Sequence, residues 1–336
     1  MDNFTSPNSE FTNDEQLPVS ENQVVYPPKF EKREEPANVW LKSIVSLALY
    51  LILGYYVFHS FTMLLLITAI VMFHELGHFF AMKYFRYNDL GIFFIPLLGA
   101  YVSGTKREVS QKESAIILLA GPLPGIIVGI ILYLLWQNNP YLEIMGISYE
   151  YISLLFIFLN LINLFPVYPL DGGQLLNRVF LDEESWISKL FVFLSAAFLV
   201  WVAWKLEFWI LLIFPAMMLL RLQTDKKYNK VEKRIEQEGI NADVSYENLK
   251  DEDYWKIRNI LIEEHTSYKD FNITPPFEYH PKEEKMMASI QSLLHRHLIQ
   301  DLSIVGKIFI ILLCLAAFAA PWLLNMDMSR FSRFGF

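Results

Sequence analysis

The sequence has little cysteine, little charge and no cluster of basic residues, and each shortage narrows what the protein can be. The one cysteine among its 336 residues, Cys314, leaves no intramolecular disulfide. Because Cys314 lies in an apolar run, we expect a small packed or lipid-facing residue rather than a reactive thiol. Charged residues make up 19% of the chain, and its formal net charge is -8. Without a dense basic stretch, nucleic acid is not an expected partner.

The amino-terminal segment also lacks the basic and then apolar order of a secretory signal peptide. Residues 1–35 are rich in acidic, Asn, Ser and Pro residues and show no periodicity typical of a packed element. We therefore expect residues 1–38 to form a flexible tail.

Hydrophobic residues, by contrast, are abundant and account for 54% of the chain. They form runs long enough, or nearly long enough, to cross a bilayer. These runs cover 39–57, 61–85, 114–136, 149–170, 186–204, 208–220 and 303–324. The pattern predicts an all-α polytopic membrane protein with six or seven transmembrane helices, in contact with membrane lipid. The short run 208–220 is expected to form a helical hairpin with the run before it.

The charged side chains are concentrated outside these runs and divide the chain into parts. We predict a tail at 1–38, a membrane domain at 39–221, a charged segment at 222–302, a carboxy-terminal transmembrane helix at 303–324 and a tail at 325–336. The charged segment has helical periodicity at 228–238 and 282–302 but indicates no fold family. Its four histidines are expected to be surface residues rather than metal ligands. They are His265, His280, His295 and His297.

Lys and Arg are distributed unevenly between the two ends of the apolar runs. Basic residues precede the first run, lie between the second and third, and follow the fourth and the sixth, whereas the loop 137–148 has none. By the positive-inside rule, the basic ends, the amino terminus and segment 222–302 are cytoplasmic.

The second apolar run contains a cluster of ionisable residues at 74–78, His-Glu-Leu-Gly-His. On a helix with about 3.6 residues per turn, His74 and His78 project from one face and can hold a single zinc ion. Glu75 lies beside them, in the position of a general base. Each ionisable side chain costs about 2.5–3.5 kcal/mol at the centre of a membrane helix, so three together indicate a compensating metal ion.

A third ligand is expected because catalytic zinc usually has three protein ligands and a fourth position open to water. Asp171 is the candidate, since the predicted topology brings the end of the fourth run to the depth of the two histidines. Alone, Asp171-Gly172-Gly173 is ordinary turn chemistry after a helix. Beside a buried histidine pair, the metal-ligand interpretation is favoured.

Two motifs carry a resemblance to a known family. The motif at 74–78, followed by Asn-Leu-Phe-Pro-Val-Tyr-Pro-Leu-Asp-Gly-Gly at 163–173, resembles the paired signatures of the site-2 protease family of intramembrane zinc metalloproteases. The resemblance covers a catalytic core at 61–177. It implies Zn2+ bound by His74, His78 and Asp171, with Glu75 as the catalytic base.

The resemblance also assigns residues that contact the substrate. It implies that Asn163 helps to bind substrate or the oxyanion; an Asn that cross-links helices in the bilayer is the alternative. Segment 91–104 resembles the family's membrane-dipping β-hairpin, which would place Gly99 and Tyr101 against the substrate. The alternative there is an amphipathic loop on the bilayer surface.

Two departures from the family are visible. Gly125 stands where the family has an Asn, and close helix packing is the expected role of this glycine. The stretch between Gly104 and Ser114 is too short for the peptide-binding domain of the PDZ type that many bacterial members insert there. We therefore expect a member without that domain.

Together these features predict an intramembrane zinc endopeptidase that cleaves single-pass membrane proteins in regulated intramembrane proteolysis. A bacterial cytoplasmic membrane is the expected location. A helical substrate would have to unwind, because lipid does not replace its internal hydrogen bonds. The substrate's identity, a preceding cleavage and the oligomeric state are left open.

Three other functions fit the sequence less well. A metal transporter with one intramembrane zinc site would not need Glu75, and an intact motif is unexpected in a non-proteolytic scaffold. A di-iron desaturase needs about eight histidines in several boxes, whereas this chain has seven in all.

Overall fold

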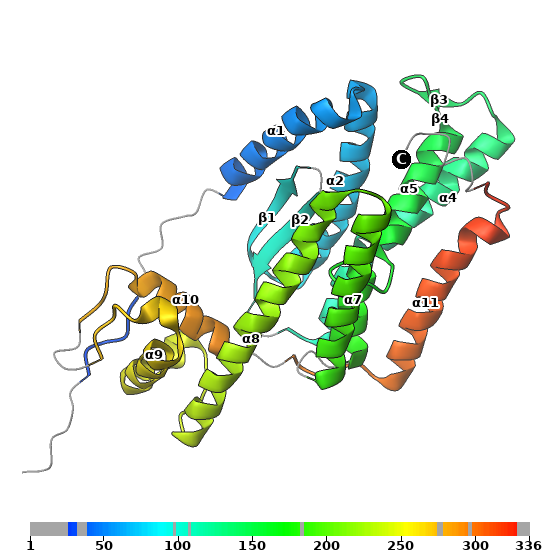
Figure 1. Cartoon of the computed structure of the whole chain (residues 1–336). Helices are drawn as coiled ribbons and strands as arrows, with labels where there is room; N and C mark the ends of the chain where they lie inside the picture. Colours follow the sequence, from blue (N-terminus) through cyan, green and yellow to red (C-terminus); the bar gives the residue numbers. More distant parts are fainter. Residues whose placement is uncertain are drawn as a thin grey trace, which may run out of the picture.

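The structure, a computed structural model, describes residues 26–31, 39–96, 99–106, 109–181, 185–273, 278–294 and 298–327. These residues form a bundle of long apolar helices, two small sheets, and a group of shorter helices at one end of the bundle (Figure 1). The predicted class, a helical polytopic membrane protein with a small β-hairpin, is confirmed.

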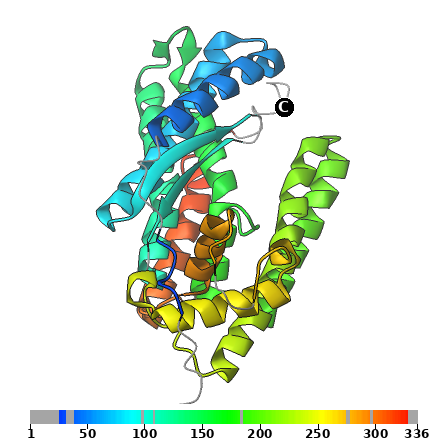
Figure 2. The same ribbon diagram turned by 90° about the vertical axis from the view of Figure 1, so that its left-hand side faces the viewer.

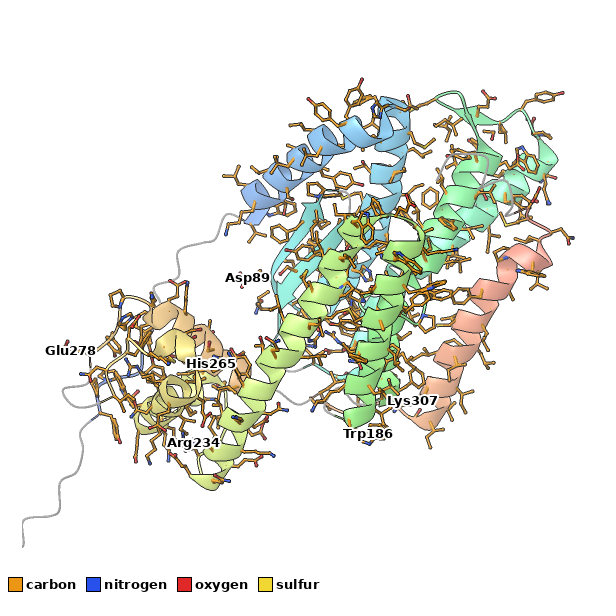
Figure 3. The ribbon with its side chains drawn as sticks, viewed as in Figure 1. Asp89, Trp186, Arg234, His265, Glu278 and Lys307 are labelled. Carbon is orange, nitrogen blue, oxygen red and sulfur yellow. The ribbon has the colours of Figure 1, made fainter. Side chains whose placement is uncertain are left out.

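Five helical segments in the described part of the chain are long and apolar enough to cross a membrane. They are α1 (Val39–Phe58), α2 (Phe61–Tyr84), α3 (Gln111–Ala120) together with α4 (Pro122–Asn138), α7 (Trp186–Lys205) and α11 (Ile304–Leu323). A shorter apolar helix, α5 (Tyr149–Asn163), packs along α4. The first residues of α7 and α11 lie at the same end of the bundle, as Trp186 and Lys307 show (Figure 3).

Two of the predicted runs end differently from what the sequence pattern indicated. The fourth helix stops at Asn163 instead of continuing to 170, because Pro166 and Pro169 follow and the chain turns back towards the bundle. The sixth run begins with a 3-10 turn at Trp209–Leu212 and continues as α8 (Ile213–Gln237). The predicted domain boundary at 221/222 therefore falls inside one helix, since neither Gly nor Pro interrupts the chain there. Helices α7 and α8 lie side by side as the predicted hairpin (Figure 1).

The larger sheet is an antiparallel hairpin of β1 (Asn88–Ile95) and β2 (Gly99–Thr105). Helix α1 packs over β1, and α2 contacts both strands (Figure 2). The backbone N–H of Phe94 donates to Ser46 Oγ of α1 over 3.1 Å, and the rings of Phe94 and Tyr50 lie 5.4 Å apart. The smaller sheet pairs β3 (Glu143–Ile144) with β4 (Ile147–Ser148).

The charged segment folds into a compact unit, here called the charged module, formed by the second half of α8, α9 (Asp251–Glu264), α10 (Glu283–Leu293) and the short turns Tyr246–Asn248 and Thr266–Tyr268. Its core is apolar and includes Val231, Ile235, Trp255, Leu261 and Met286. Because Val231 and Ile235 belong to α8, the module is joined to the membrane bundle by a continuous helix.

The module differs from the sequence interpretation in two details. Helix α10 ends at Leu293, earlier than the predicted 302. His265 is half-buried between the rings of Tyr228 and Tyr268, and His280 stacks on Phe271 at 4.0 Å, so these two histidines are packing residues. His295 and His297 lie outside the described residues.

Part of the amino-terminal tail, residues 1–38, is held against the rest of the protein, although the sequence predicts a flexible tail. Residues 26–31 run extended against the charged module, with Tyr26 and Phe30 packed on its core. The tail and the module therefore lie on the same side of the bundle. The remaining tail residues lie outside the described part of the chain.

Candidate metal centre

Helix α2 carries the two histidines. It begins after Ser60, whose hydroxyl accepts a hydrogen bond from the backbone N–H of Met63, and it ends at Tyr84. His74 and His78 are one turn apart and face the bundle interior, with 6% and 8% of their surface exposed. Their Nε2 atoms lie 3.0 Å from each other.

Asp171 joins them from a distant part of the sequence. It is the first residue of α6 (Asp171–Leu175), and its Oδ2 lies 3.0 Å from His74 Nε2 and 3.2 Å from His78 Nε2. Among the described residues, these three form the one group of His, Cys, Asp or Glu side chains that could hold a metal ion. The structure thus brings together the three residues that the sequence nominated as ligands.

The loop before Asp171 is held by two other helices. The backbone N–H of Tyr168 donates to Ser195 Oγ of α7 over 3.2 Å. Arg221 of α8 donates to the Tyr168 hydroxyl, and its guanidinium lies 5.4 Å from the centre of the Tyr168 ring. Asp171 is therefore positioned by contacts with α7 and α8 as well as by its own turn.

Both histidines are oriented through their second ring nitrogen. His74 Nδ1 lies 2.8 Å from Asn160 Oδ1, and Asn160 Nδ2 donates to Phe156 O over 2.7 Å. His78 Nδ1 lies 2.8 Å from the backbone oxygen of Ile117. Since both partners are acceptors, each Nδ1 carries the proton and each Nε2 offers its lone pair to the shared point.

Asn160 is a residue that the sequence analysis missed. It is 1% exposed and lies three residues before the nominated Asn163 on α5. The available signal was a second amide in an apolar membrane run, where polar side chains are costly unless paired. Which of the two amides faces the histidines depends on helix rotation, and the motif alone does not determine it.

Small residues leave room at the centre for an ion. A Cβ atom built on Gly121, at the break between α3 and α4, would lie 2.3 Å from His78 Nε2 and 2.9 Å from His74 Nε2. A Cβ on Gly77 would lie 1.9 Å from Ala120 O, so this glycine lets α2 approach α3. Tetrahedral ligands about 2.0–2.2 Å from one ion are about 3.3 Å apart, close to the observed 3.0–3.2 Å. The donor set fits a small divalent metal ion.

Glu75 and the hairpin adjoin this centre. Glu75 is 6% exposed, and its carboxylate takes a backbone hydrogen bond from Val102 of β2. In the same strand, Gly99 has a φ of 114°, a left-handed conformation that favours glycine, and Tyr101 is 48% exposed opposite Phe93. Asn163 donates to Leu159 O of its own helix over 3.1 Å. Substrate contact by Gly99, Tyr101 and Asn163 stays a prediction.

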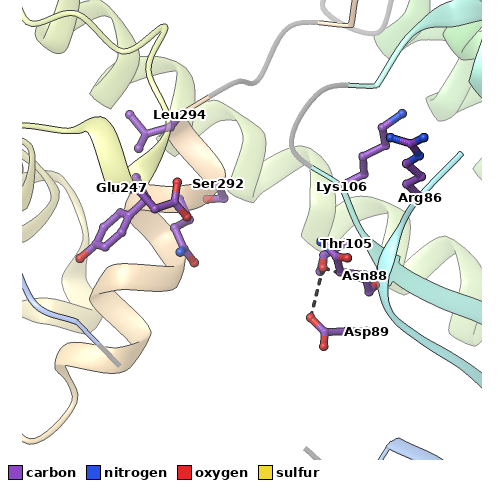
Figure 4. A pocket seen from close by; sticks show the side chains of 10 residues that line it. Arg86, Asn88, Asp89, Thr105, Lys106, Glu247, Ser292 and Leu294 are labelled. Carbon is purple, nitrogen blue, oxygen red and sulfur yellow. Dashed lines mark hydrogen bonds between the residues drawn. The ribbon is translucent and has the colours of Figure 1, made fainter. Parts of the chain in front are cut away.

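A polar cavity lies farther along the hairpin, between its base and the charged module (Figure 4). Its volume is about 830 Å³. One wall is formed by the end of α2 and the hairpin, where Thr105 donates to Asp89 over 3.3 Å, and the other by the module, including Tyr246 and Glu247. The cavity separates the module from the hairpin that reaches Glu75.

The helices and the site together define a class: a polytopic membrane protein with a metalloprotease-type centre in its interior. Residues 62–150 match the model of peptidase family M50. The chain therefore carries a site-2 protease domain of this family, as the two sequence motifs indicated.

Two relatives and one solved structure are similar to parts of the chain. The chain is 26% identical to stage IV sporulation protein FB of Bacillus subtilis over 179 residues, 49% of this chain and 60% of that protein. It is 28% identical to a zinc metalloprotease of Methanocaldococcus jannaschii over 134 residues, 40% of this chain and 38% of that protein. The matches thus span less than two thirds of either relative. A solved site-2 protease from Methanocaldococcus jannaschii aligns with a TM-score of 0.39 and 24% identity, covering 53% of this chain and 84% of that one.

Proposed function

We propose that this chain is an intramembrane zinc endopeptidase that cleaves single-pass membrane proteins. The observation that carries the proposal is the convergence of His74 Nε2, His78 Nε2 and Asp171 Oδ2 within 3.0–3.2 Å of one another. The two histidines and the adjacent Glu75 lie on α2, which is long and apolar enough to cross a membrane. The site-2 protease relatives support the same activity.

His74, His78 and Asp171 would hold the zinc ion, since two imidazoles and a carboxylate are a known ligand set for catalytic zinc. Zinc bound there would supply Lewis acidity and lower the pKa of a bound water towards 7. The hydrogen bonds between the two Nδ1 atoms and Asn160 or Ile117 leave both Nε2 atoms available to hold such an ion.

Glu75 acts as the general base and then as the general acid. It accepts a proton from the water that attacks the scissile carbonyl and passes that proton to the leaving amine. Its position beside the ligands, on the same helix turn, suits this role. The Asn163 amide is proposed to donate to the oxyanion that forms at the carbonyl.

The hairpin supplies a way to hold an unwound substrate. A transmembrane helix hides its carbonyls in internal hydrogen bonds, and lipid offers no replacement. A substrate strand that pairs with the hairpin, near Gly99 and Tyr101, would regain these bonds by β-augmentation. Because Val102 of β2 contacts Glu75, a strand at this sheet lies next to the catalytic residue.

The protein is proposed to lie in a bacterial cytoplasmic membrane with its amino terminus and the charged module inside. The basic residues at one end of the spans support this orientation. Residues 26–31 bind the module, so both share one side. An impermeant thiol reagent tests the orientation in a Cys314→Ala background. It should label Tyr141→Cys, and not Glu252→Cys, in intact cells; the reverse pattern would invert the orientation.

Substrate identification tests the proposed function directly. Membrane fractions from cells with wild-type protein or Glu75→Gln are compared by quantitative proteomics. An intact single-pass protein should accumulate in the Glu75→Gln cells, with its fragment present in the wild type. Equal membrane proteomes, with both proteins expressed and loaded with zinc, would favour a transporter or scaffold instead.

A further inference from the structure

The charged module has a surface groove formed by aromatic side chains, and residues 26–31 lie in it. The groove, here called the aromatic groove, is formed by the aromatic side chains of Tyr246, Trp255 and Tyr279, with the carboxylate of Asp251 beside them. Its occupant has the sequence Tyr-Pro-Pro-Lys-Phe-Glu and runs extended without helix or strand structure. More than two hundred residues separate the occupant from each of these groove residues.

Three carbonyl groups of the segment are recognised by aromatic donors. Trp255 Nε1 donates to Pro27 O over 2.8 Å, the Tyr279 hydroxyl donates to Pro28 O, and the Tyr246 hydroxyl donates to Phe30 O over 2.5 Å. Prolines fix the extended backbone in advance and leave it only acceptors. Aromatic grooves that bind Pro-rich peptides use this same chemistry. Burial raises the pKa of Tyr246 and of Tyr279, so both phenols keep the proton they donate.

The lysine of the segment is recognised separately. Its ammonium donates to the backbone oxygens of Glu247 and Leu249 over 2.6 and 2.8 Å and lies 5.8 Å from the centre of the Tyr246 ring. Its backbone N–H donates to Asp251 Oδ1 over 2.9 Å. Three of its hydrogen bonds therefore depend on the module, and two of them need a positive charge at position 29.

Phe30 completes the set of contacts. Its ring packs edge-on against Tyr279 at 5.5 Å and joins the apolar core of the module. Tyr279 in turn stacks on Trp255 at 5.8 Å. The side-chain contacts thus select a lysine and an aromatic residue at positions 29 and 30. At positions 27 and 28 the module contacts backbone carbonyls, and proline is favoured there because it fixes the backbone in advance.

We infer that the aromatic groove is a peptide-recognition site for an extended Pro-Pro-Lys-aromatic sequence, and that residues 26–31 are its ligand in cis. A segment of the same sequence on another polypeptide binds the groove when the chain's own segment leaves. Tyr246 and Glu247 also line the cavity that faces the hairpin. Because these two residues also bind Lys29 and Phe30, release of the segment would change the contacts of one wall of that cavity. This inference does not depend on the proposed proteolysis.

The test uses a fluorescent synthetic peptide with the sequence of residues 23–34 and purified full-length protein. The double variant Lys29→Glu/Phe30→Ala, here called the release variant, removes the Lys29 and Phe30 side-chain contacts, so residues 26–31 should dissociate and leave the groove open. This variant should bind the peptide saturably in an anisotropy titration. A tethered ligand has an effective concentration on the order of millimolar, so the wild-type protein should bind the peptide at least about tenfold more weakly.

Matched variants separate recognition from general loosening. Glu31→Gln changes an exposed residue of the same segment and should behave as the wild type does. Adding Tyr279→Phe to the release variant removes only the hydroxyl that binds Pro28 O and should weaken peptide binding roughly five- to tenfold. A peptide with Glu in place of Lys29 should not bind.

Two results would overturn the inference. One is the absence of peptide binding by the release variant and by a milder second variant, Lys29→Met, when both melt at the wild-type temperature. The other is equal binding by the wild-type protein and the release variant, which would mean that residues 26–31 do not occupy the groove.

Discussion

The metal centre and the charged module both bury charge, but they bury it in opposite ways. In the module, Arg258 and Glu283 are 0% and 1% exposed, and their closest atoms lie 2.7 Å apart. Glu283 also accepts from the Tyr254 hydroxyl over 2.7 Å and from the backbone N–H of His280 over 2.9 Å, while Arg258 donates to Asn272 O. Each charge faces its complement, and the group is satisfied within the protein.

In the metal centre the buried groups that face one another are all electron-pair donors. Each Nδ1–H donates a hydrogen bond to Asn160 or Ile117, so the two Nε2 lone pairs and the Asp171 carboxylate all point to one place. Lone pairs and a carboxylate attract a cation and repel each other. A buried set that is complementary stabilises a fold, whereas a buried set that converges on one point indicates a bound ion and a function.

Changing Glu75 should give the largest effect on activity and leave the metal in place. Glu75→Gln keeps the size of the side chain and removes the proposed base, so cleavage of a co-expressed substrate should slow by a factor of about 100 to 10,000. Zinc content should stay at the wild-type value. Substantial turnover at normal expression and zinc content would mean that another group activates the water.

Breaking the Arg258 and Glu283 pair should destabilise the module and leave the metal centre unchanged. Arg258→Met leaves a buried carboxylate without its partner, which costs about 3–5 kcal/mol. Hydrogen exchange of the α9 and α10 amides should accelerate accordingly. The double variant Arg258→Met/Glu283→Met should recover most of the loss. Unchanged protection in the single variant would contradict a structural role for the pair.

Removing the amide that orients His74 should weaken metal binding without abolishing it. Asn160→Ala is expected to lower zinc affinity about 10- to 100-fold, measured by competition with a chromogenic chelator. Two glycines of α4 provide a matched pair. A Cβ on Gly125 would lie 2.2 Å from Asn160 Nδ2, whereas one on Gly129 would lie 2.5 Å from Ile157 Cγ1. Gly125→Ala should weaken zinc binding and Gly129→Ala should not; equal effects would assign the loss to helix packing.

The smallest effect concerns pH and the module. Burial, with a contribution from Lys227, lowers the pKa of His265 below its usual 6.5, so the folded module favours the neutral ring. The unfolded chain then binds more protons, and the stability that His265 contributes is present above pH 6.5 and is lost as the pH falls through the folded pKa. His265→Phe should flatten the pH dependence of module unfolding below pH 6.5. An unchanged slope would show that His265 does not titrate on unfolding.

Local patterns were enough to predict the fold class and the proximity of His74, His78 and Asp171; their role as metal ligands stays a prediction. Helix geometry places His74 and His78 on one face wherever a helix forms, and span counting brings Asp171 to the same end. The fold class and the family are confirmed. These predictions succeeded because they depend on period, span length and order along the chain.

Other features, most of which depend on contacts between distant segments, were not predicted. Asn160 can contact His74 only because Gly125 of α4 has no side chain to collide with the Asn160 amide, and the motif does not show this space. Residues 26–31 lack periodicity, so the sequence predicts a flexible tail there. They are nevertheless bound by a groove whose residues lie more than two hundred positions farther along the chain. The continuity of α8 was missed for another reason: a change from apolar to charged composition does not end a helix, whereas Gly or Pro does.

Zinc content of purified protein tests the central claim, a three-ligand metal site, most directly. The wild-type protein is predicted to bind one zinc ion per chain, and Asp171→Ala to lose most of it, because Asp171 is the proposed third ligand. His265→Ala, a histidine outside the site, should keep the full amount. Full zinc occupancy in Asp171→Ala would remove Asp171 from the ligand set and contradict the account.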